Sequence, residues 1–203
     1  MISDVHVGYK KLKHLEPLLY KWISLNAKYC KTFSDDCLYW YNERATLSSL
    51  AAAVWKCNEY ALEEYRTDKI YGREYWPGRA DLWFSWKRTT YLAEAKQVYA
   101  SLSTKAKKSS EKIRKALKQA KMDAAASRGE SDNRLGIVFA IPYIPPSEIK
   151  KTATRIEIFL DEINSIEHDL MAYYLLDKSS MLTTANGYAY PGVVLVARVT
   201  KRK

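Results

Sequence analysis

The sequence has few cysteines, and their spacing excludes two kinds of site. Among its 203 residues are three cysteines, which are irregularly spaced and form no C-x-x-C pair. Structural zinc sites and redox dithiols use such pairs, so neither is expected. We expect reduced thiols and a cytoplasmic location. The cysteines are Cys30, Cys37 and Cys57.

Long apolar runs are also absent. No segment approaches the about 20 apolar residues of a membrane-spanning helix, and the start MISDVHVGYKK lacks the apolar centre of a signal peptide. We therefore expect no membrane partner. The three histidines (His6, His14 and His168) are scattered, so structural or surface roles are expected for them.

The composition that is present is that of a folded, basic domain. Hydrophobic residues make up 47% and charged residues 28% of the chain, which is typical of globular proteins. The length favours a single domain over residues 1–203. Lysine and arginine total 33 against 23 acids, a formal charge of +10. This surplus favours polyanionic partners, although many basic proteins have none.

Hydrophobic spacing predicts alternating helices and short strands. A mixed central sheet flanked by helices, an α/β fold, is the natural arrangement for this order. Helices are expected from near Glu16 to about 30, over 42–59, over 104–126 and over about 147–176; strands are expected over 62–69, 79–86, 90–98, 134–144 and 192–199.

Three charged residues lie in the predicted hairpin of strands 79–86 and 90–98. Asp81 falls early in the first strand, and Glu94 and Lys96 lie two residues apart in the second. Alternate residues share a face of a strand, so Glu94 and Lys96 point the same way. The hairpin should bring all three side chains together. The alternative is an ion-pair ladder across a surface hairpin, but the apolar residues around them favour buried strands.

This cluster is best explained by a bound divalent cation. Two carboxylates are costly to bury unless a cation balances them. Mg²⁺ prefers oxygen ligands, and Asp81, Glu94 and the backbone carbonyl of Ala95 could supply three. Mn²⁺ is an alternative. Lys96 could orient the attacking water, hold the phosphate or stabilise developing charge, and the sequence does not choose between these roles.

The pattern resembles the PD-(D/E)XK family of restriction-endonuclease-like nucleases. Asp81 is followed by twelve residues and then by Glu94, Ala95 and Lys96. The resemblance implies a core of order α-β-β-β-α-β over about 42–141, with additional elements at both ends. The chain departs from the family name in having Ala80 where proline usually precedes the aspartate.

Further site residues are implied by the same resemblance. A first-helix glutamate often joins the metal site, and Glu43 is the best candidate, with Glu59 and Glu64 as weaker ones. Arg79 is expected to contact phosphate. Gln97 could bind substrate or water, or be a polar residue at a strand edge.

The predicted helix 104–126 is strongly basic and is expected to follow a nucleic-acid backbone. A solvated face that keeps the protein soluble explains its lysines equally well. Tyr71, Tyr75 and Trp76, in a predicted loop before Asp81, could contact bases. The basic candidates are Lys105, Lys107, Lys108, Lys112, Arg114, Lys115 and Lys118.

The function implied by the resemblance is Mg²⁺-dependent hydrolysis of phosphodiester bonds in DNA, with RNA as an alternative substrate and a phage or defence setting. A second interpretation is a catalytically inactive nucleic-acid-binding module of the same fold, acting in a larger assembly. A protein-interaction subunit is a third. A homodimer or a subunit of a larger complex is compatible with each.

Overall fold

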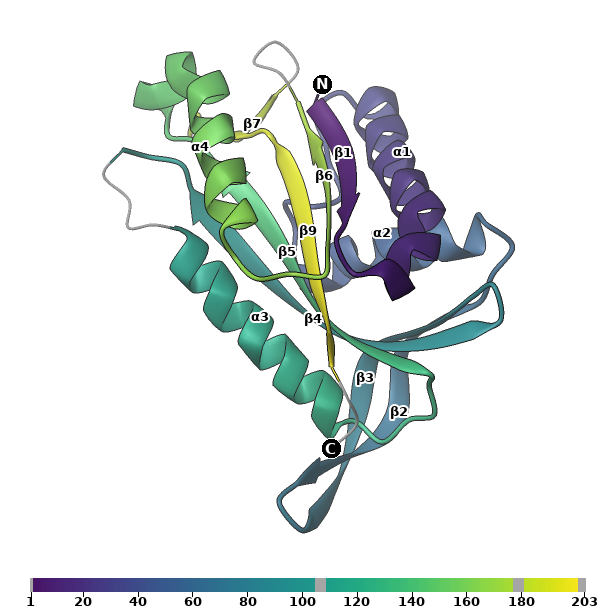
Figure 1. The fold of residues 1–203 in the computed structure, drawn as a ribbon. Coiled ribbons are helices and arrows are strands. Elements are labelled where there is room, and N and C mark those ends of the chain that lie inside the picture. The colour runs from purple at the N-terminus through teal and green to yellow at the C-terminus, as the bar shows by residue number, and fades with distance from the viewer. Residues whose placement is uncertain (1, 105–108, 177–180, 201–203) are drawn as a thin grey trace.

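The computed structural model describes residues 2–104, 109–176 and 181–200. It is an α/β structure built on a mixed seven-stranded sheet (Figure 1). The strands lie in the order β1-β6-β9-β5-β4-β3-β2. β4 and β5 pair parallel, and the other neighbouring strands of this sheet pair antiparallel. The sheet strands are β1 (Ile2–Val7), β2 (Ala61–Tyr71), β3 (Glu74–Trp86), β4 (Thr89–Ser101), β5 (Asn133–Tyr143), β6 (Leu170–Leu175) and β9 (Gly192–Thr200).

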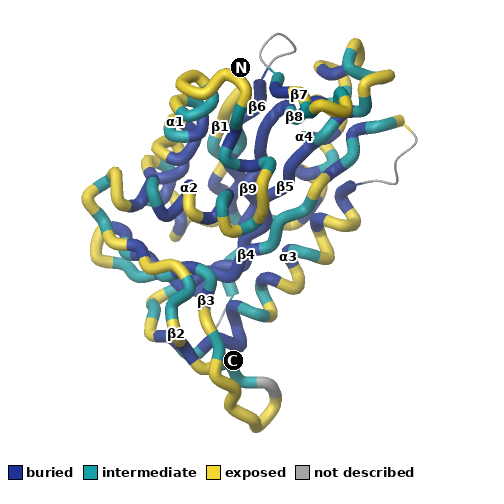
Figure 2. Tube along the Cα trace, turned by 180° about the vertical axis from the view of Figure 1, so that it is seen from behind, coloured by how far each residue is buried: buried dark blue, intermediate teal, exposed yellow. Residues whose placement is uncertain are grey.

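Helices cover both faces of the sheet. α1 and α2 lie on one face, and α3 and α4 lie on the other (Figures 1 and 2). Short elements complete the described chain: the 3-10 helices η1 and η2 and the small β7–β8 pair. The bounds are η1 (Lys10–Leu15), α1 (Glu16–Thr32), α2 (Glu43–Trp55), α3 (Ser109–Ala126), η2 (Pro146–Lys151), α4 (Thr152–Asn164), β7 (Leu182–Thr183) and β8 (Ala189–Tyr190).

Because helices lie on both faces, the central strands are apolar on both sides. Ile137 and Phe139 of β5 belong to the core under α1 and α2. The alternate residues Val138 and Ala140 belong to the core under α3 and α4. This explains the uninterrupted apolar run in the sequence, which predicted a strand buried on both faces.

Local sequence signals account for two helix starts. Pro17 lies in the first turn of α1, where its missing N–H group breaks no helical hydrogen bond. Asn42 precedes α2, and its side-chain oxygen accepts a hydrogen bond of 2.9 Å from the N–H of Ala45. Such a cap satisfies one of the free donors at a helix start. It also fixes the position of Glu43 in the first turn of α2.

The order α-β-β-β-α-β predicted for the central part is confirmed by α2, β2, β3, β4, α3 and β5. The single helix predicted over 147–176 is wrong. It ends at Asn164, and residues 170–175 form β6 between β1 and β9. The apolar residues after Asn164 continue the helical spacing, but the open edge of β9 offers a complete row of strand partners. β1 was not predicted.

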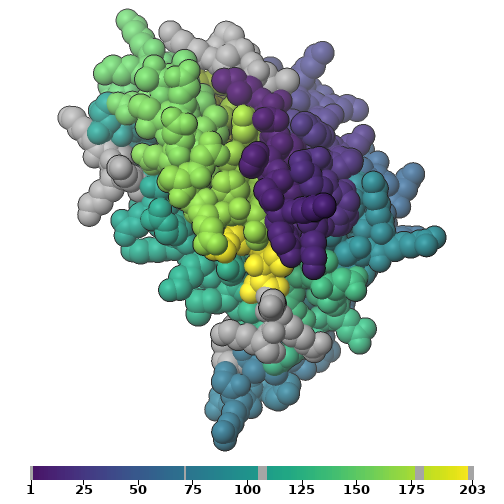
Figure 3. All heavy atoms as spheres, in the orientation of Figure 1, coloured from purple at the N-terminus to yellow at the C-terminus, as the bar shows by residue number. Residues whose placement is uncertain are grey.

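The loop predicted before Asp81 is also wrong in part. Tyr75 and Trp76 belong to β3, which starts at Glu74. β2 and β3 form a long hairpin whose tip projects from the body of the molecule (Figure 3). Within the described residues, no helix has the length and apolar character needed to cross a membrane.

Candidate active site

The candidate site lies where β3 and β4 separate. The two strands pair as far as Leu82 and Ala93. Beyond that point β3 continues beside β2, whereas β4 continues beside β5. Asp81 and Glu94 are the next residues on the two strands. Opposed residues of an antiparallel pair share a face, so both acids lie at the mouth of the gap, on the face that α3 covers.

Beyond Ala93, β4 has no strand partner among the described residues on the side of β3, and two carboxylates accept the hydrogen bonds of its N–H groups there. Oδ2 of Asp81 accepts a hydrogen bond of 2.7 Å from the N–H of Ala95, and Oε2 of Glu43 accepts one of 2.8 Å from the N–H of Gln97. The N–H and C=O groups of one strand residue point to the same neighbour. The carbonyl of Ala95 therefore faces the gap, beside the carboxylate of Asp81.

Glu94 is almost completely buried, with 2% of its side chain exposed. Its Oε2 lies 3.0 Å from Nζ of Lys69 on β2, and its Oε1 accepts a hydrogen bond of 2.8 Å from the hydroxyl of Ser127. The pKa of Glu94 is raised to about 7, first by burial and then by the charge of Asp81, although Lys69 and Ser127 act in the opposite direction. Burial and Asp81 thus favour the protonated form of Glu94, whereas Lys69 and Ser127 stabilise its carboxylate.

Lys96 is surrounded by acids. Its Nζ lies 3.4 Å from Oδ2 of Asp123 on α3. Burial lowers the pKa of Lys96, but the carboxylates of Asp81, Asp123 and Glu43 outweigh burial and raise it overall. Lys96 is therefore a fixed positive charge at neutral pH. A third of its side chain is exposed.

Glu43 lies near this cluster, since its Oε2 accepts from the N–H of Gln97 and its charge acts on Lys96. Its role as an auxiliary metal ligand stays a prediction. The pKa of Glu43 is raised by burial, against the charge of Lys96 and the hydrogen bond from Gln97. The weaker candidates lie elsewhere: Glu59 accepts from Ser85 and Lys87, and Glu64 pairs with Arg44 and Arg79.

The side chain of Gln97 faces α2 rather than the acids. Its Oε1 accepts a hydrogen bond of 2.7 Å from the hydroxyl of Thr46, and its Nε2 donates to the hydroxyl of Tyr99 at 3.0 Å. Tyr99 in turn donates to the backbone carbonyls of Trp40 and Tyr41. These bonds tie β4 to the start of α2, so the side chain of Gln97 holds Glu43 near the gap.

The sequence did not indicate Lys69, Asp123, Ser127 or Arg134. Arg134 is buried and donates to the carbonyls of Ala124, Ser127 and Gly129, which fixes the turn that carries Ser127. The sequence could have indicated Asp123, because an acidic residue is unusual in such a basic helix. The sequence could not have indicated Lys69, because its position beside Glu94 depends on the pairing of β2 with β3.

The predicted nucleic-acid contacts lie on the surface. Arg79 is 66% exposed, and its Nη1 is 3.5 Å from Oε2 of Glu64. Lys105, Lys107 and Lys108 lie outside the described residues. Lys112, Arg114, Lys115 and Lys118 are exposed on α3, and Lys115 pairs with Glu111 at 3.1 Å.

The donor set fits Mg²⁺ in chemical type. Among the residues described, no group of three or more histidine, cysteine, aspartate or glutamate side chains is arranged to hold a metal ion. Mg²⁺, however, is usually held by one or two carboxylates and completed by water and phosphate oxygens. Asp81, Glu94 and the carbonyl of Ala95 meet that requirement. The ammonium of Lys69 already places a positive charge beside Glu94.

Comparison of the chain with models of protein families, with curated proteins and with solved structures finds no match. The functional argument therefore depends on the residues around the β3–β4 gap.

Proposed function

We propose that the protein is a Mg²⁺-dependent nuclease of the PD-(D/E)XK type that hydrolyses phosphodiester bonds in DNA. The observation that carries the proposal is the gap between β3 and β4, where Asp81 and Glu94 face each other and Lys96 lies on the same face as Glu94. Buried acids in such a place need a compensating cation. Four carboxylates, those of Asp81, Glu94, Glu43 and Asp123, meet two ammonium groups, those of Lys69 and Lys96. Subtracting two from four leaves two negative charges when all four acids are ionised, which a divalent cation would balance.

The residues that would hold Mg²⁺ are Asp81, Glu94 and the carbonyl of Ala95, with Glu43 as an auxiliary acid. When bound, Mg²⁺ would supply Lewis-acid stabilisation of the negative charge that develops on the phosphate oxygens. The hydrogen bond from Ala95 orients Asp81 toward the gap. A carboxylate has about four acceptor positions, so this bond leaves Asp81 able to act as a ligand.

Lys96 contributes charge rather than a base. Because its pKa is raised, it stays protonated at neutral pH and cannot take a proton from water. It can donate hydrogen bonds to the attacking water or to a phosphate oxygen, and stabilise the charge of the transition state. Its contact with Asp123 holds the ammonium group near the gap.

Surface features support nucleic acid as the substrate. The chain carries a formal charge of +10, and lysines and arginines lie along the exposed side of α3. At the tip of the β2–β3 hairpin, Tyr75 is 70% exposed and Trp76 is 55% exposed. Exposed aromatic rings can stack on bases that are not paired.

One observation favours the inactive binding module as a second candidate. Both carboxylate oxygens of Glu94 already have protein partners, Lys69 and Ser127. If these contacts are permanent, Glu94 serves only to stabilise the fold. The surface features would then provide nucleic-acid binding without cleavage.

The two candidates are separated by measuring cleavage and binding on the same samples. Purified protein is incubated with single-stranded DNA, duplex DNA or RNA in EDTA, Mg²⁺ or Mn²⁺, and Lys96→Met is compared with the control Lys21→Met, an exposed lysine on α1. The nuclease proposal predicts cleavage that needs metal, is lost in Lys96→Met and is kept in the control. Binding without cleavage in either metal would support the inactive module. Cleavage that persists in EDTA would contradict the proposal.

A further inference from the structure

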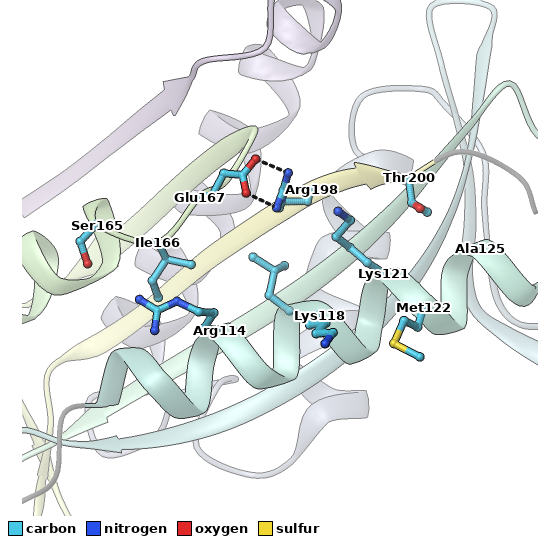
Figure 4. Close-up of a pocket in the computed structure, with 11 residues that line it drawn as sticks. Arg114, Lys118, Lys121, Met122, Ala125, Ser165, Ile166, Glu167, Arg198 and Thr200 are labelled. Atoms are coloured by element: carbon cyan, nitrogen blue, oxygen red, sulfur yellow. Dashed lines mark hydrogen bonds and ion pairs between the residues drawn. The ribbon is translucent and has the colours of Figure 1, made fainter.

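A second site is suggested by a pocket beside α3, away from the acidic gap (Figure 4). The pocket has a volume of about 530 Å³ and lies between α3, the segment that joins α4 to β6, and the end of β9. Pockets that bind small ligands have volumes of about 300–1,000 Å³. This one is large enough for a small molecule or for one unit of a polymer.

The pocket and the acidic cluster use opposite sides of α3. Arg114, Lys118, Lys121 and Met122 line the pocket and repeat at helical spacings of three and four, so they share one side of the helix. With 3.6 residues per turn, Asp123 projects from the other side, where it pairs with Lys96. A ligand in the pocket would therefore not compete directly with one in the gap.

The lining combines an apolar floor with a positive rim. Leu117 and Ile166 are both 2% exposed and form part of the floor, and the thioether of Met122 lies at the side. The rim carries four cations, Arg114, Lys118, Lys121 and Arg198, and one carboxylate, Glu167. Subtracting one from four leaves a surplus of three positive charges. The pocket is complementary to a ligand with an apolar body and more than one negative charge.

Arg198 is held in place by a two-point ion pair. Its Nη1 and Nη2 donate to Oε2 and Oε1 of Glu167 at 2.7 and 2.5 Å. Its Nε is buried and has no hydrogen-bond partner among the residues described. A buried donor is normally satisfied by protein, water or ligand. The two-point ion pair fixes the guanidinium group at this wall of the pocket, where its positive charge adds to the rim.

We propose that this pocket binds a nucleotide unit, with phosphate on Arg114 and Lys118, which are one helical turn apart, and the base against Leu117, Ile166 and Met122. In Figure 4 Arg114 extends toward Ile166 and Lys121 extends toward Arg198, so cations lie at both ends of the apolar floor. Guanidinium and ammonium groups bind phosphate by charge-assisted hydrogen bonds, and apolar side chains pack on the flat face of a base.

A phosphate-bearing base can come from two sources, a free nucleotide or a nucleic-acid strand that runs along α3. A free fatty acid fits less well, because cations border the floor along its length and leave no enclosed apolar channel. The proposal does not depend on the nuclease activity, since none of the residues in the acidic gap lines the pocket.

Binding is measured in EDTA, so that the acidic gap does not contribute. The probes are a fluorescent adenine nucleotide, an oligothymidylate and inorganic phosphate. Arg114→Glu and Lys118→Glu reverse charges at the rim, and Lys21→Glu is the matched control, an exposed lysine on α1 that lies outside the pocket and outside the predicted nucleic-acid contacts. Ser165→Trp tests the pocket by filling it without changing charge, and thermal unfolding checks that each variant is folded.

We expect Arg114→Glu and Lys118→Glu to weaken binding by about tenfold each, which is the loss of one strong phosphate contact, and Ser165→Trp to weaken it as well. Lys21→Glu should change affinity about twofold or less. Binding of the mononucleotide in this pattern identifies a free nucleotide, and the same pattern with the oligonucleotide alone identifies a strand. Equal loss in the Lys21→Glu control, or no binding of either probe, would overturn the proposal.

Discussion

Nζ of Lys69 lies 3.0 Å from Oε2 of Glu94, so a predicted metal ligand already faces a cation that the protein itself supplies. The two residues come from strands separated by β3 in the sheet. The β2–β3 hairpin lies next to the gap between β3 and β4, so Lys69 of β2 reaches Glu94 of β4. Lys69 thereby stabilises the buried carboxylate and at the same time competes with a divalent cation for it.

Replacing Lys69 with methionine should therefore strengthen metal binding at alkaline pH. Lys69 lowers the pKa of Glu94, which is about 7 in the wild type, so its removal raises that pKa and the comparison is made well above it, at about pH 9. There, removing a nearby positive charge favours Mn²⁺ by roughly tenfold. Electron paramagnetic resonance of free Mn²⁺ measures the affinity. Lys13→Met, which removes an exposed partner of Glu16, is the control. Unchanged or weaker binding in Lys69→Met would show that Lys69 does not compete for the site.

The pKa of Glu94 predicts how stability depends on pH in EDTA. Its folded pKa of about 7 lies above the ordinary value of 4.5, so between these values the folded protein holds a proton that the unfolded chain has lost. Stability from this group is complete below pH 4.5 and is lost as the pH rises toward 7. The loss is on the order of 3 kcal/mol.

Denaturant unfolding of wild type and Glu94→Gln between pH 5 and 8 measures this dependence, because glutamine does not titrate. The free energy of unfolding of the wild type should fall relative to that of the variant as the pH rises. Parallel curves would mean that Glu94 has an ordinary pKa in the folded protein.

Gly136 sets the distance between α3 and β5, and this distance positions Asp123 and Ser127. A Cβ atom at residue 136 would lie 2.4 Å from the backbone nitrogen of Lys121. Gly136→Ala must push α3 away, and we expect a destabilisation of about 1–3 kcal/mol. At Gly8 the nearest atom would be 3.9 Å away, so Gly8→Ala is the matched control. Equal unfolding midpoints for the two variants would contradict this close packing.

Glu43 is expected to assist rather than to be essential. In Glu43→Gln the side-chain oxygen can still accept from the N–H of Gln97, but the negative charge near Lys96 and Asp81 is lost. We expect cleavage to slow by about 10–100-fold, with the metal concentration for half-maximal rate raised. Glu16→Gln, a change of a partly exposed glutamate at the start of α1, controls for general effects. A wild-type rate in Glu43→Gln would remove Glu43 from the site.

The central elements could be predicted from the sequence because their apolar spacing is local. Helical spacing identified α1, α2 and α3, and the short connections identified the β2–β3–β4 meander. The prediction failed after Asn164, where the same apolar spacing suits a helix and a strand. The neighbouring strand β9 decides between them, and that information is not local.

The residues of the candidate site were likewise predictable only where their positions depend on local sequence. Asp81, Glu94 and Lys96 were identified because they lie within one hairpin. Lys69 and Ser127 were not, because their contacts depend on where β2 bends over the gap and where α3 ends. The separation of β3 from β4 was also unpredictable, since nothing in the spacing of either strand indicates where the pairing stops.

The central claim is that the β3–β4 gap is a metal-dependent cleavage site, and single-turnover cleavage of DNA in saturating Mg²⁺ tests it most directly. Asp81→Asn removes the charge of one ligand and keeps its shape, and Asp161→Asn makes the same change on the exposed surface of α4. The account predicts that Asp81→Asn loses at least about 100-fold in rate while Asp161→Asn equals the wild type. Equal cleavage by Asp81→Asn and wild type would contradict it.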